Sequence, residues 1–398
     1  HLFKQEMGDK PYLQIEVDEH FSNVGVITRI EAFLNSLNHR PVEVLPKDFV
    51  LEQVDIRPCH LPAVPEKDFP LWLPPLGEYT ASLTGYFRAQ GVDAHALPHL
   101  SAHALSLGCA ETSAKEYLPF PALLGGILAQ QEADPAPAQF LIPQTRGAEA
   151  DGQYARVIRA VLDRRGNQSA KLVSPMLETL PATAQDRDAL FRALLAGDIL
   201  YAAPAAMRAG IAAAWDTLPG WAQLHKAAVE IGRCPATGRR LATVGTPLCL
   251  TELDSGVLST LEAEGSQLLR APLSEALWFL WKDNMDANKP CAKWLEQMAQ
   301  EMQTIGAELG AHSTFAQDTA ALFETADTIL PHFAGGNGRY RYAKAVELSG
   351  RADAVLTLAP RYENAATILD MRGLRDACKA PLFQLSLDND WDETAWSR

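Results

Sequence analysis

Short apolar runs alternate with amphipathic helical segments along most of this chain, and this alternation constrains the fold more than any other feature. The predicted strands cover residues 71–77, 92–98, 138–143, 170–175, 240–247, 267–272, 354–359 and 381–388. Strands that are joined by helices through short loops form parallel sheets covered on both faces. The pattern therefore predicts an α/β fold with two doubly wound, Rossmann-like parallel-sheet domains joined by a helical connector.

The same pattern predicts the domain boundaries. One α/β domain covers 51–180, an Ala-rich helical connector covers 181–238, and a second α/β domain covers 239–398. The second domain contains a helical insert with Trp294, Leu295, Met298, Met302 and Ile305 at helical spacing, which we interpret as core. Residues 1–50 form a strand-helix segment, which we interpret as the terminal piece of a repeated α/β unit because residues 11–18 resemble residues 381–388.

Three helices carry detailed predictions. The first has Asp151 as its N-cap and Gly166 as its end, with one inward face. That face is made of Tyr154, Val157, Ile158, Val161 and Leu162. The second opens at Asp254 or Ser255 and stops at Gly265, with Val257, Leu258 and Leu261 inward. A third helix, before Gly91, places Tyr79, Leu83, Tyr86 and Phe87 on one face.

Composition excludes several classes of protein. The 398 residues are 47% hydrophobic and carry a formal net charge of -14, which argues against disorder and against a nucleic-acid partner. No run is apolar for long enough to cross a membrane, and no signal peptide is apparent, so we expect a cytoplasmic protein without membrane contact.

The chain lacks an initiator Met, and we expect it to be a piece of a longer, multidomain protein. Its six cysteines contain no C-x-x-C pair and fit reduced, mostly buried thiols.

Ligands of open α/β sheets bind beyond the carboxyl ends of the strands, and three polar loops qualify as candidate sites. The cofactor-binding or cleft candidates are Thr112, Ser113, Lys115, Glu116 and Tyr117 in the first loop, Thr145, Arg146, Gly147, Glu149, Gln153 and Tyr154 in the second, and Glu363 in the third. We expect the first two loops to lead into helix N-termini, which attract carboxylates or phosphates. The alternative is that Thr112, Ser113 and Asp151 only cap helices.

Two further motifs carry less weight. Gly335-Gly336-Asn337-Gly338 follows no predicted strand and lacks the Lys-Ser/Thr ending of an ATP loop, so we interpret it as a flexible loop. His95, His99 and His103 are spaced by four, but Pro98 interrupts any helix that would align them. We therefore expect no metal site there.

Several segments of the chain form a recognisable set. The longest is Asp18-Glu19-His20-Phe21-Ser22-Asn23-Val24-Gly25-Val26-Ile27-Thr28-Arg29-Ile30-Glu31-Ala32-Phe33-Leu34. The others are Thr112-Ser113-Ala114-Lys115-Glu116, Gly152-Gln153-Tyr154, Val244-Gly245, Ala271-Pro272-Leu273-Ser274-Glu275 and the strand before Ala359-Pro360. Together they resemble the large proteins related to the activators of 2-hydroxyacyl-CoA dehydratases, the CoA-substrate-specific enzyme activase family. The resemblance covers most of the chain and corresponds to the dehydratase-like region that follows the ATPase domains.

The resemblance implies an ATP-driven, low-potential electron-transfer system with iron-sulfur clusters. In this chain Tyr117, Glu149 and Glu363 stand at the positions where the family has its cluster cysteines. Iron-sulfur clusters require thiolate ligands, so the substitutions predict a degenerate site and no expected cofactor. The motifs of the activator ATPase are not visible in this chain.

Three hypotheses follow. In the first, the chain is a non-catalytic domain or subunit that docks an ATPase or reductase component, possibly on the same parent chain. In the second, it is an enzyme in which Glu116, Glu149 and Glu363 line an interdomain cleft for a hard metal ion or an acyl-CoA-like substrate, with Lys115 or Arg146 holding an anion. In the third, which ranks lowest, the scattered cysteines still hold a cluster. The catalytic residues are unknown, and whether the chain is an enzyme stays open.

Overall fold

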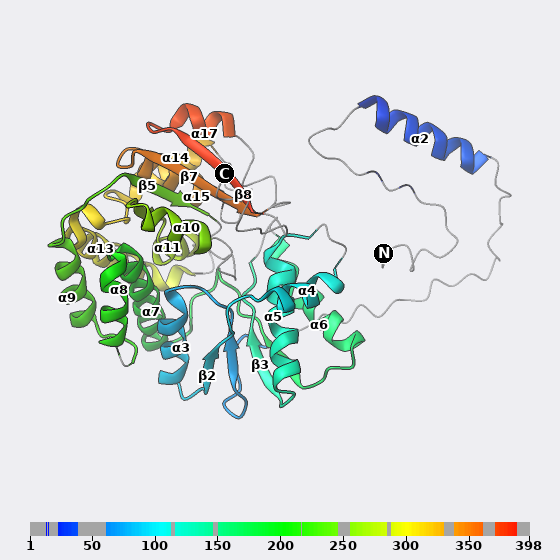
Figure 1. The fold of residues 1–398 in the computed structure, drawn as a ribbon, viewed down its shortest axis with the longest axis horizontal. Helices are drawn as coiled ribbons and strands as arrows, with labels where there is room; N and C mark the ends of the chain where they lie inside the picture. The colour runs from blue at the N-terminus through cyan, green and yellow to red at the C-terminus, as the bar shows by residue number, and fades with distance from the viewer. Residues whose placement is uncertain are drawn as a thin grey trace. The chain divides into compact units, whose positions relative to one another are not determined.

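The computed structural model divides into two compact units, residues 1–59 and 60–398 (Figure 1). It describes residues 13, 15, 23–38, 61–112, 116–145, 150–215, 217–245, 255–284, 288–329, 338–360 and 371–387. The first unit contains helix α2 (Asn23–Asn38), on which Ile27 and Leu34 are exposed. The predicted strand over 11–18 lies outside the described residues. Among the described helices, none has both the length and the apolar character needed to cross a membrane.

The first sheet of the larger unit has four parallel strands in the order β2-β1-β3-β4. These strands are β1 (Leu71–Leu73), β2 (Ala94–Ala96), β3 (Ala138–Leu141) and β4 (Ala170–Val173). The helices that follow them are α3 (Tyr79–Ala89), α4 (Ala102–Ala110), α5 (Pro119–Ala133), the 3-10 turn η1 (Ala150–Gln153) and α6 (Tyr154–Arg164). Leu71 pairs with Ala94 on one side and Gln139 on the other, so β1 lies inside the sheet.

The second sheet is also parallel, and its order β6-β5-β7-β8 repeats the arrangement of the first. Its strands are β5 (Arg240–Val244), β6 (Gln267–Arg270), β7 (Ala354–Pro360) and β8 (Leu382–Leu387). Its helices are α10 (Ser255–Ala263), α11 (Leu273–Asp283), η2 (Lys289–Cys291), α13 (Ala292–Leu309), η3 (Gly310–His312), α14 (Thr319–Ile329), α15 (Gly338–Ser349) and α17 (Met371–Ala377). Two parallel four-stranded sheets confirm the predicted fold class.

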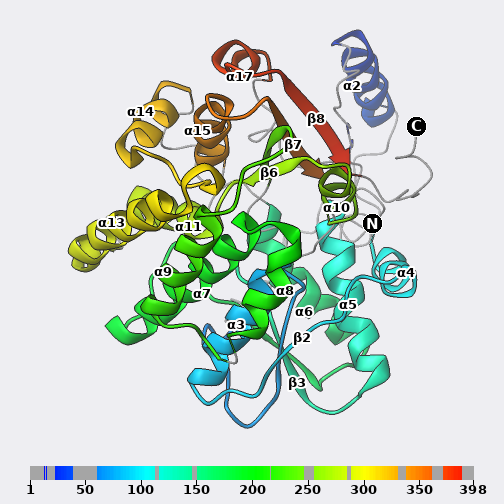
Figure 2. The same cartoon turned by 60° about the vertical axis from the view of Figure 1, so that its left-hand side comes forward.

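Three helices without intervening strands connect the sheets: α7 (Ala184–Ala202), α8 (Ala205–Ala213) and α9 (Trp221–Gly232). Thr183 caps α7 by accepting a hydrogen bond from the backbone N–H of Asp186. The middle of α7 is buried on all sides because it packs against α3, α9 and α11. One hydrophobic core therefore runs from β1 and α3 through the connector to α11 and α13. Figure 2 shows α7 between α3 and α11.

The insert helix α13 buries the predicted stripe of Leu295, Met298, Met302 and Ile305. Trp294 is partly buried and packs against the same core. These side chains contact α9 and α11 instead of lining a cofactor pocket. The interpretation of this stripe as core is confirmed.

Two details of α6 differ from the prediction. Val157 is 44% exposed, while Tyr154, Ile158, Val161 and Leu162 are buried. The inward face is centred between Ile158 and Leu162, which leaves Val157 just outside the buried arc. The backbone at Asp151 belongs to η1, and the N-cap is Gln153, so the predicted Asp151 cap is wrong.

Candidate functional site

The second predicted loop closes tightly at the carboxyl end of β3. A Cβ atom on Gly152 would lie 2.4 Å from the carbonyl oxygen of Thr145, so only glycine allows this approach. The chain consequently makes a 3-10 turn before α6 begins, and this turn displaces Asp151 from the N-cap position. The Gln153 side chain accepts a hydrogen bond from Arg156 and does not cap the helix.

The structure brings the first two loops together through an aromatic contact. The ring of Tyr154, at the start of α6, lies 5.1 Å from the ring of Phe120, at the start of α5. The backbone N–H of Phe120 donates to the carbonyl of Tyr117, which holds the end of the first loop against α5. Tyr117 and Tyr154 therefore belong to neighbouring segments, as the carboxyl-edge argument predicts.

Thr112 does not stand at a helix start. Glu111 is the C-cap of α4, and the Thr112 hydroxyl donates to the carbonyl of Cys109 at 3.1 Å. The next helix begins only at Pro119. The expectation that Thr112 caps a helix N-terminus is wrong, because Thr112 directly follows the carbonyl end of α4. Anion binding by this loop stays a prediction.

Several predicted site residues lie outside the described part of the chain. These are Ser113, Lys115, Arg146, Gly147, Glu149 and Glu363. Glu116 lies in the described part and is half-buried. Convergence of Glu116, Glu149 and Glu363 on a metal ion or a substrate therefore stays a prediction.

The described residues do not fit an iron-sulfur cluster. Tyr117 offers a phenol where the family pattern has a thiolate, and the described cysteines lie on separate elements. Those cysteines are Cys109, Cys234, Cys291 and Cys378. Burial raises the pKa of the thiols of Cys109 and Cys378, which disfavours the thiolate that cluster iron binds. No step of the proposed function is assigned to a cluster.

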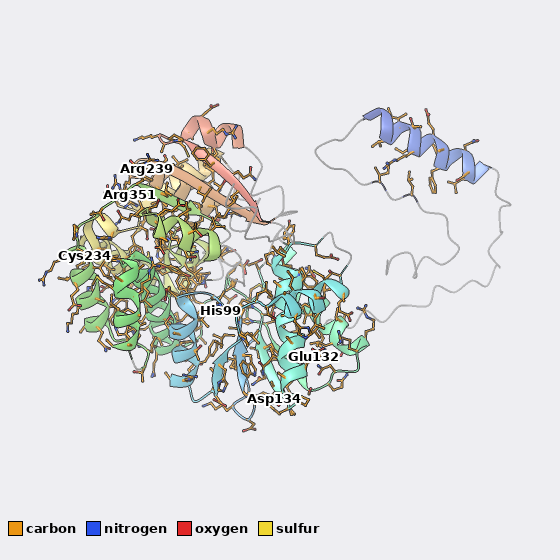
Figure 3. The ribbon with its side chains drawn as sticks, viewed as in Figure 1. His99, Glu132, Asp134, Cys234, Arg239 and Arg351 are labelled. Carbon is orange, nitrogen blue, oxygen red and sulfur yellow. The ribbon has the colours of Figure 1, made fainter. Side chains whose placement is uncertain are left out.

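The histidines also form no metal centre within the described residues. His95 pairs with Asp93, and His103 on α4 pairs with Glu132 on α5. Figure 3 shows His99 near the first sheet and Cys234 on the opposite side of the helical connector. No cluster of three or more His, Cys, Asp or Glu side chains suited to a metal ion occurs in the described ranges.

A buried carboxylate that the sequence reasoning missed links the two sheets. Asp198, in the middle of α7, is 3% exposed. It accepts hydrogen bonds from the Tyr79 hydroxyl at 2.5 Å, from the backbone N–H of Leu273 at 2.8 Å and from that of Ser274 at 3.1 Å. Asp198 thus satisfies the first N–H groups of α11 and joins them to the start of α3.

Burial dominates the electrostatics of this carboxylate. Loss of solvent raises the pKa of Asp198 to about 6, although the hydrogen bonds from Ser274, Tyr79 and Leu273 oppose the shift. Burial and the neighbouring Asp198 charge also raise the pKa of Tyr79 well above its usual value. The Tyr79 phenol therefore stays a proton donor to Asp198 at neutral pH. A single acid inside the apolar stretch 194–200 is the sequence signal that points to such a site.

A second buried polar group lies further along α11. Glu275 accepts hydrogen bonds from the Tyr340 hydroxyl at 2.9 Å and from the backbone N–H of Ala316 at 2.6 Å. The Lys344 ammonium lies 2.7 Å from Glu275 and 3.1 Å from Glu347. Glu275 and Lys344 have no exposed surface, so they form a fully desolvated ion pair that fixes α11 to α15.

A cavity of about 830 Å³ lies beside the carboxyl ends of β1 and β2, between α3 and the connector helices. We call it the α3 groove, and it is lined by Pro75, Gly77, Thr80, Ala81, Ser82, Thr84, Gly85, Arg88, Ala89, Ala96, Leu97, His99, Arg192, Leu200, Ala212, Trp215, Thr217, Leu218 and Pro219. The volume is in the range typical of small-molecule sites. The α3 groove could not be predicted from local sequence patterns, because residues as far apart in the chain as Pro75 and Pro219 form its walls.

Comparison with known proteins gives no assignment. No protein-family model matches the chain, and no curated protein or solved structure matches it.

Proposed function

We propose that this chain is a dehydratase-like domain or subunit of a 2-hydroxyacyl-CoA dehydratase activator-type system, and that it acts as a docking module without an iron-sulfur cluster. The observation that carries the proposal is the repeated strand order of the two parallel sheets. The sequence resemblance implies a dehydratase-like α/β region, and two equivalent sheets are consistent with it. The replacement of a cluster cysteine by Tyr117 supports the loss of the redox centre.

The docking surface in this proposal is the carboxyl edge of the first sheet. There the loop that ends at Tyr117 and the start of α6 are held together by the contact between Phe120 and Tyr154. Such an edge is where open α/β sheets present their functional loops. The buried bonds of Asp198 to Tyr79 and to the start of α11 join this half to the second sheet, so that the partner meets a preformed surface.

A binding experiment with an activator-type ATPase tests the proposal. Sedimentation velocity measures complex formation between the full chain and the ATPase, with ADP or a non-hydrolysable ATP analogue present. We expect a complex with the wild-type chain and a weaker complex with Glu116→Arg, which reverses a charge in the first loop.

The matched control is Asp68→Arg, the same change at an exposed acid just before β1, at the opposite edge of the sheet. Asp68→Arg is expected to leave the complex unchanged. Failure of the wild-type chain to form a complex in any nucleotide state would overturn the proposal. So would equal losses in both variants, because the effect would then not map to the carboxyl edge.

A further inference from the structure

We propose that the α3 groove binds a linear carboxylic acid, with Arg88 holding the carboxylate and the aliphatic chain lying along α3. This inference depends on the groove alone and goes beyond the docking function. Nothing in the resemblance places a ligand between α3 and the connector helices.

The α3 wall is open because one face of that helix carries small side chains. Thr80, Ala81, Gly85 and Ala89 line the groove at spacings of one, four and four residues, which places them on one face. The opposite face buries Tyr79, Leu83, Tyr86 and Phe87 in the core. Large side chains therefore anchor the helix, the small side chains of Ala81 and Ala89 line the cavity, and Gly85 allows the backbone of Leu218 to approach closely.

The polar groups of this wall are mostly satisfied within the helix. The Thr80 hydroxyl accepts a hydrogen bond from the backbone N–H of Leu76 at 2.7 Å. The Thr84 hydroxyl donates to the carbonyl of Thr80 at 2.6 Å. With these hydroxyls satisfied, the wall that Thr80 and Thr84 form together with Ala81 suits an aliphatic chain.

Two arginine side chains line the groove, and they differ in their hydrogen-bond partners. Arg192 is engaged, because its Nε pairs with Asp188 at 2.9 Å and its Nη1 donates to the carbonyl of Pro219. The Nε of Arg88 donates to the carbonyl of Ala94 at 2.9 Å, which is a neutral acceptor. Within the described residues no carboxylate pairs with Arg88, so its positive charge is available to an anion.

These features favour a monoanion with an apolar tail. A planar guanidinium matches a carboxylate through two parallel hydrogen bonds. The chain as a whole carries a net charge of -14, which repels multiply charged ligands more strongly than singly charged ones. From Thr80 to Arg88 the helix rises by about 12 Å, which is long enough for a medium-length alkyl chain to bury most of its surface.

Calorimetric titration with decanoate, below its micelle concentration, tests this inference on the full chain. Decanol and decyltrimethylammonium serve as the neutral and cationic probes. We expect decanoate to bind more tightly than either, and shortening to octanoate to weaken binding by up to about fourfold for each methylene lost. Equal affinity for decanoate and decanol, or no decanoate binding, would overturn the assignment.

Two variants locate the site. Arg88→Gln is expected to raise the Kd for decanoate about fivefold, because the guanidinium is partly exposed and its interaction is screened. Ala81→Phe adds a ring at an exposed groove position, away from the core, and is expected to abolish binding. The matched control Arg164→Gln removes an arginine from α6 and is expected to bind like wild type. Unchanged binding in both groove variants would contradict the proposal.

Discussion

Replacing Asp198 by Asn tests the buried link between the two sheets through its pH dependence. The pKa of this acid is raised from 3.8 to about 6 in the folded chain. The folded state therefore holds its proton at pH values where the unfolded state has released it. The free energy of unfolding must fall as the pH rises between these values, by about 3 kcal/mol in total. About half of that change falls between pH 5 and pH 7.5.

Asp198→Asn removes this titration while keeping an acceptor oxygen and nearly the same volume. The difference in unfolding free energy, variant minus wild type, should thus increase by about 1 kcal/mol from pH 5 to pH 7.5. Urea unfolding of both proteins at the two pH values measures it, and other titrating groups cancel in the difference. A difference that does not change with pH, or that decreases, would refute the raised pKa.

Asp198→Ala provides the comparison that separates charge from hydrogen bonding. Alanine leaves the Tyr79 hydroxyl and the N–H groups of Leu273 and Ser274 without their buried acceptor. We expect it to destabilise the chain by about 3 kcal/mol relative to Asp198→Asn, at both pH values. Equal stability of the two variants would contradict the role of Asp198 in holding the start of α11.

Two further changes test the packing between elements. Lys344→Met should destabilise the chain by about 3 to 5 kcal/mol in urea unfolding, because it leaves the charge of Glu275 buried without a cation. Adding Glu275→Gln should restore part of this loss of stability. An unchanged stability of the Lys344→Met variant would contradict the ion pair. Gly108→Ala places a Cβ atom 1.8 Å from the carbonyl oxygen of Pro121, so it should lower the free energy of unfolding by at least about 2 kcal/mol. Gly210→Ala on α8 places its Cβ atom in open space and should raise the free energy of unfolding by about 0.5 to 1 kcal/mol. Thermal melting compares the two glycines, and equal shifts would contradict the close approach of α4 and α5.

The regular elements were predictable because their signals are local. The inward face of α3, with Tyr79, Leu83, Tyr86 and Phe87, follows from helical spacing alone. The ends of α6 and α10 follow from Gly166 and Gly265, both of which have positive φ values. Short strands that alternate with such helices predict a parallel sheet, and both observed sheets are parallel.

The errors arose where a tertiary contact overrides a local preference. Asp151 has the usual residue type for an N-cap, but the packing of Gly152 on the carbonyl of Thr145 forces a 3-10 turn first. Thr112 follows a helix instead of preceding one, because the chain returns through a separate loop before α5 starts at Pro119. Capping signals show that a helix ends nearby, but not which of its two ends is meant.

The site residues likewise divide into those that local signals predict and those that depend on tertiary packing. Proximity of Tyr117 to α6 could be expected from parallel strand ends that share one edge of a sheet. The partners of Asp198 and the walls of the α3 groove could not, since both depend on how the connector helices pack against α3. A charged residue within an apolar helix indicates a buried polar contact but does not name the group that it binds.

Iron and acid-labile sulfide content tests the central claim of a cluster-free docking domain most directly. The full chain is purified without oxygen, incubated with ferrous iron, sulfide and a thiol reductant, and desalted before both elements are measured. The account predicts that iron and sulfide stay far below one cluster per chain and that no cluster absorption appears in the visible spectrum, since Tyr117 offers a phenol and the described cysteines lie on separate elements. Stoichiometric iron and sulfide retained with the protein would contradict it.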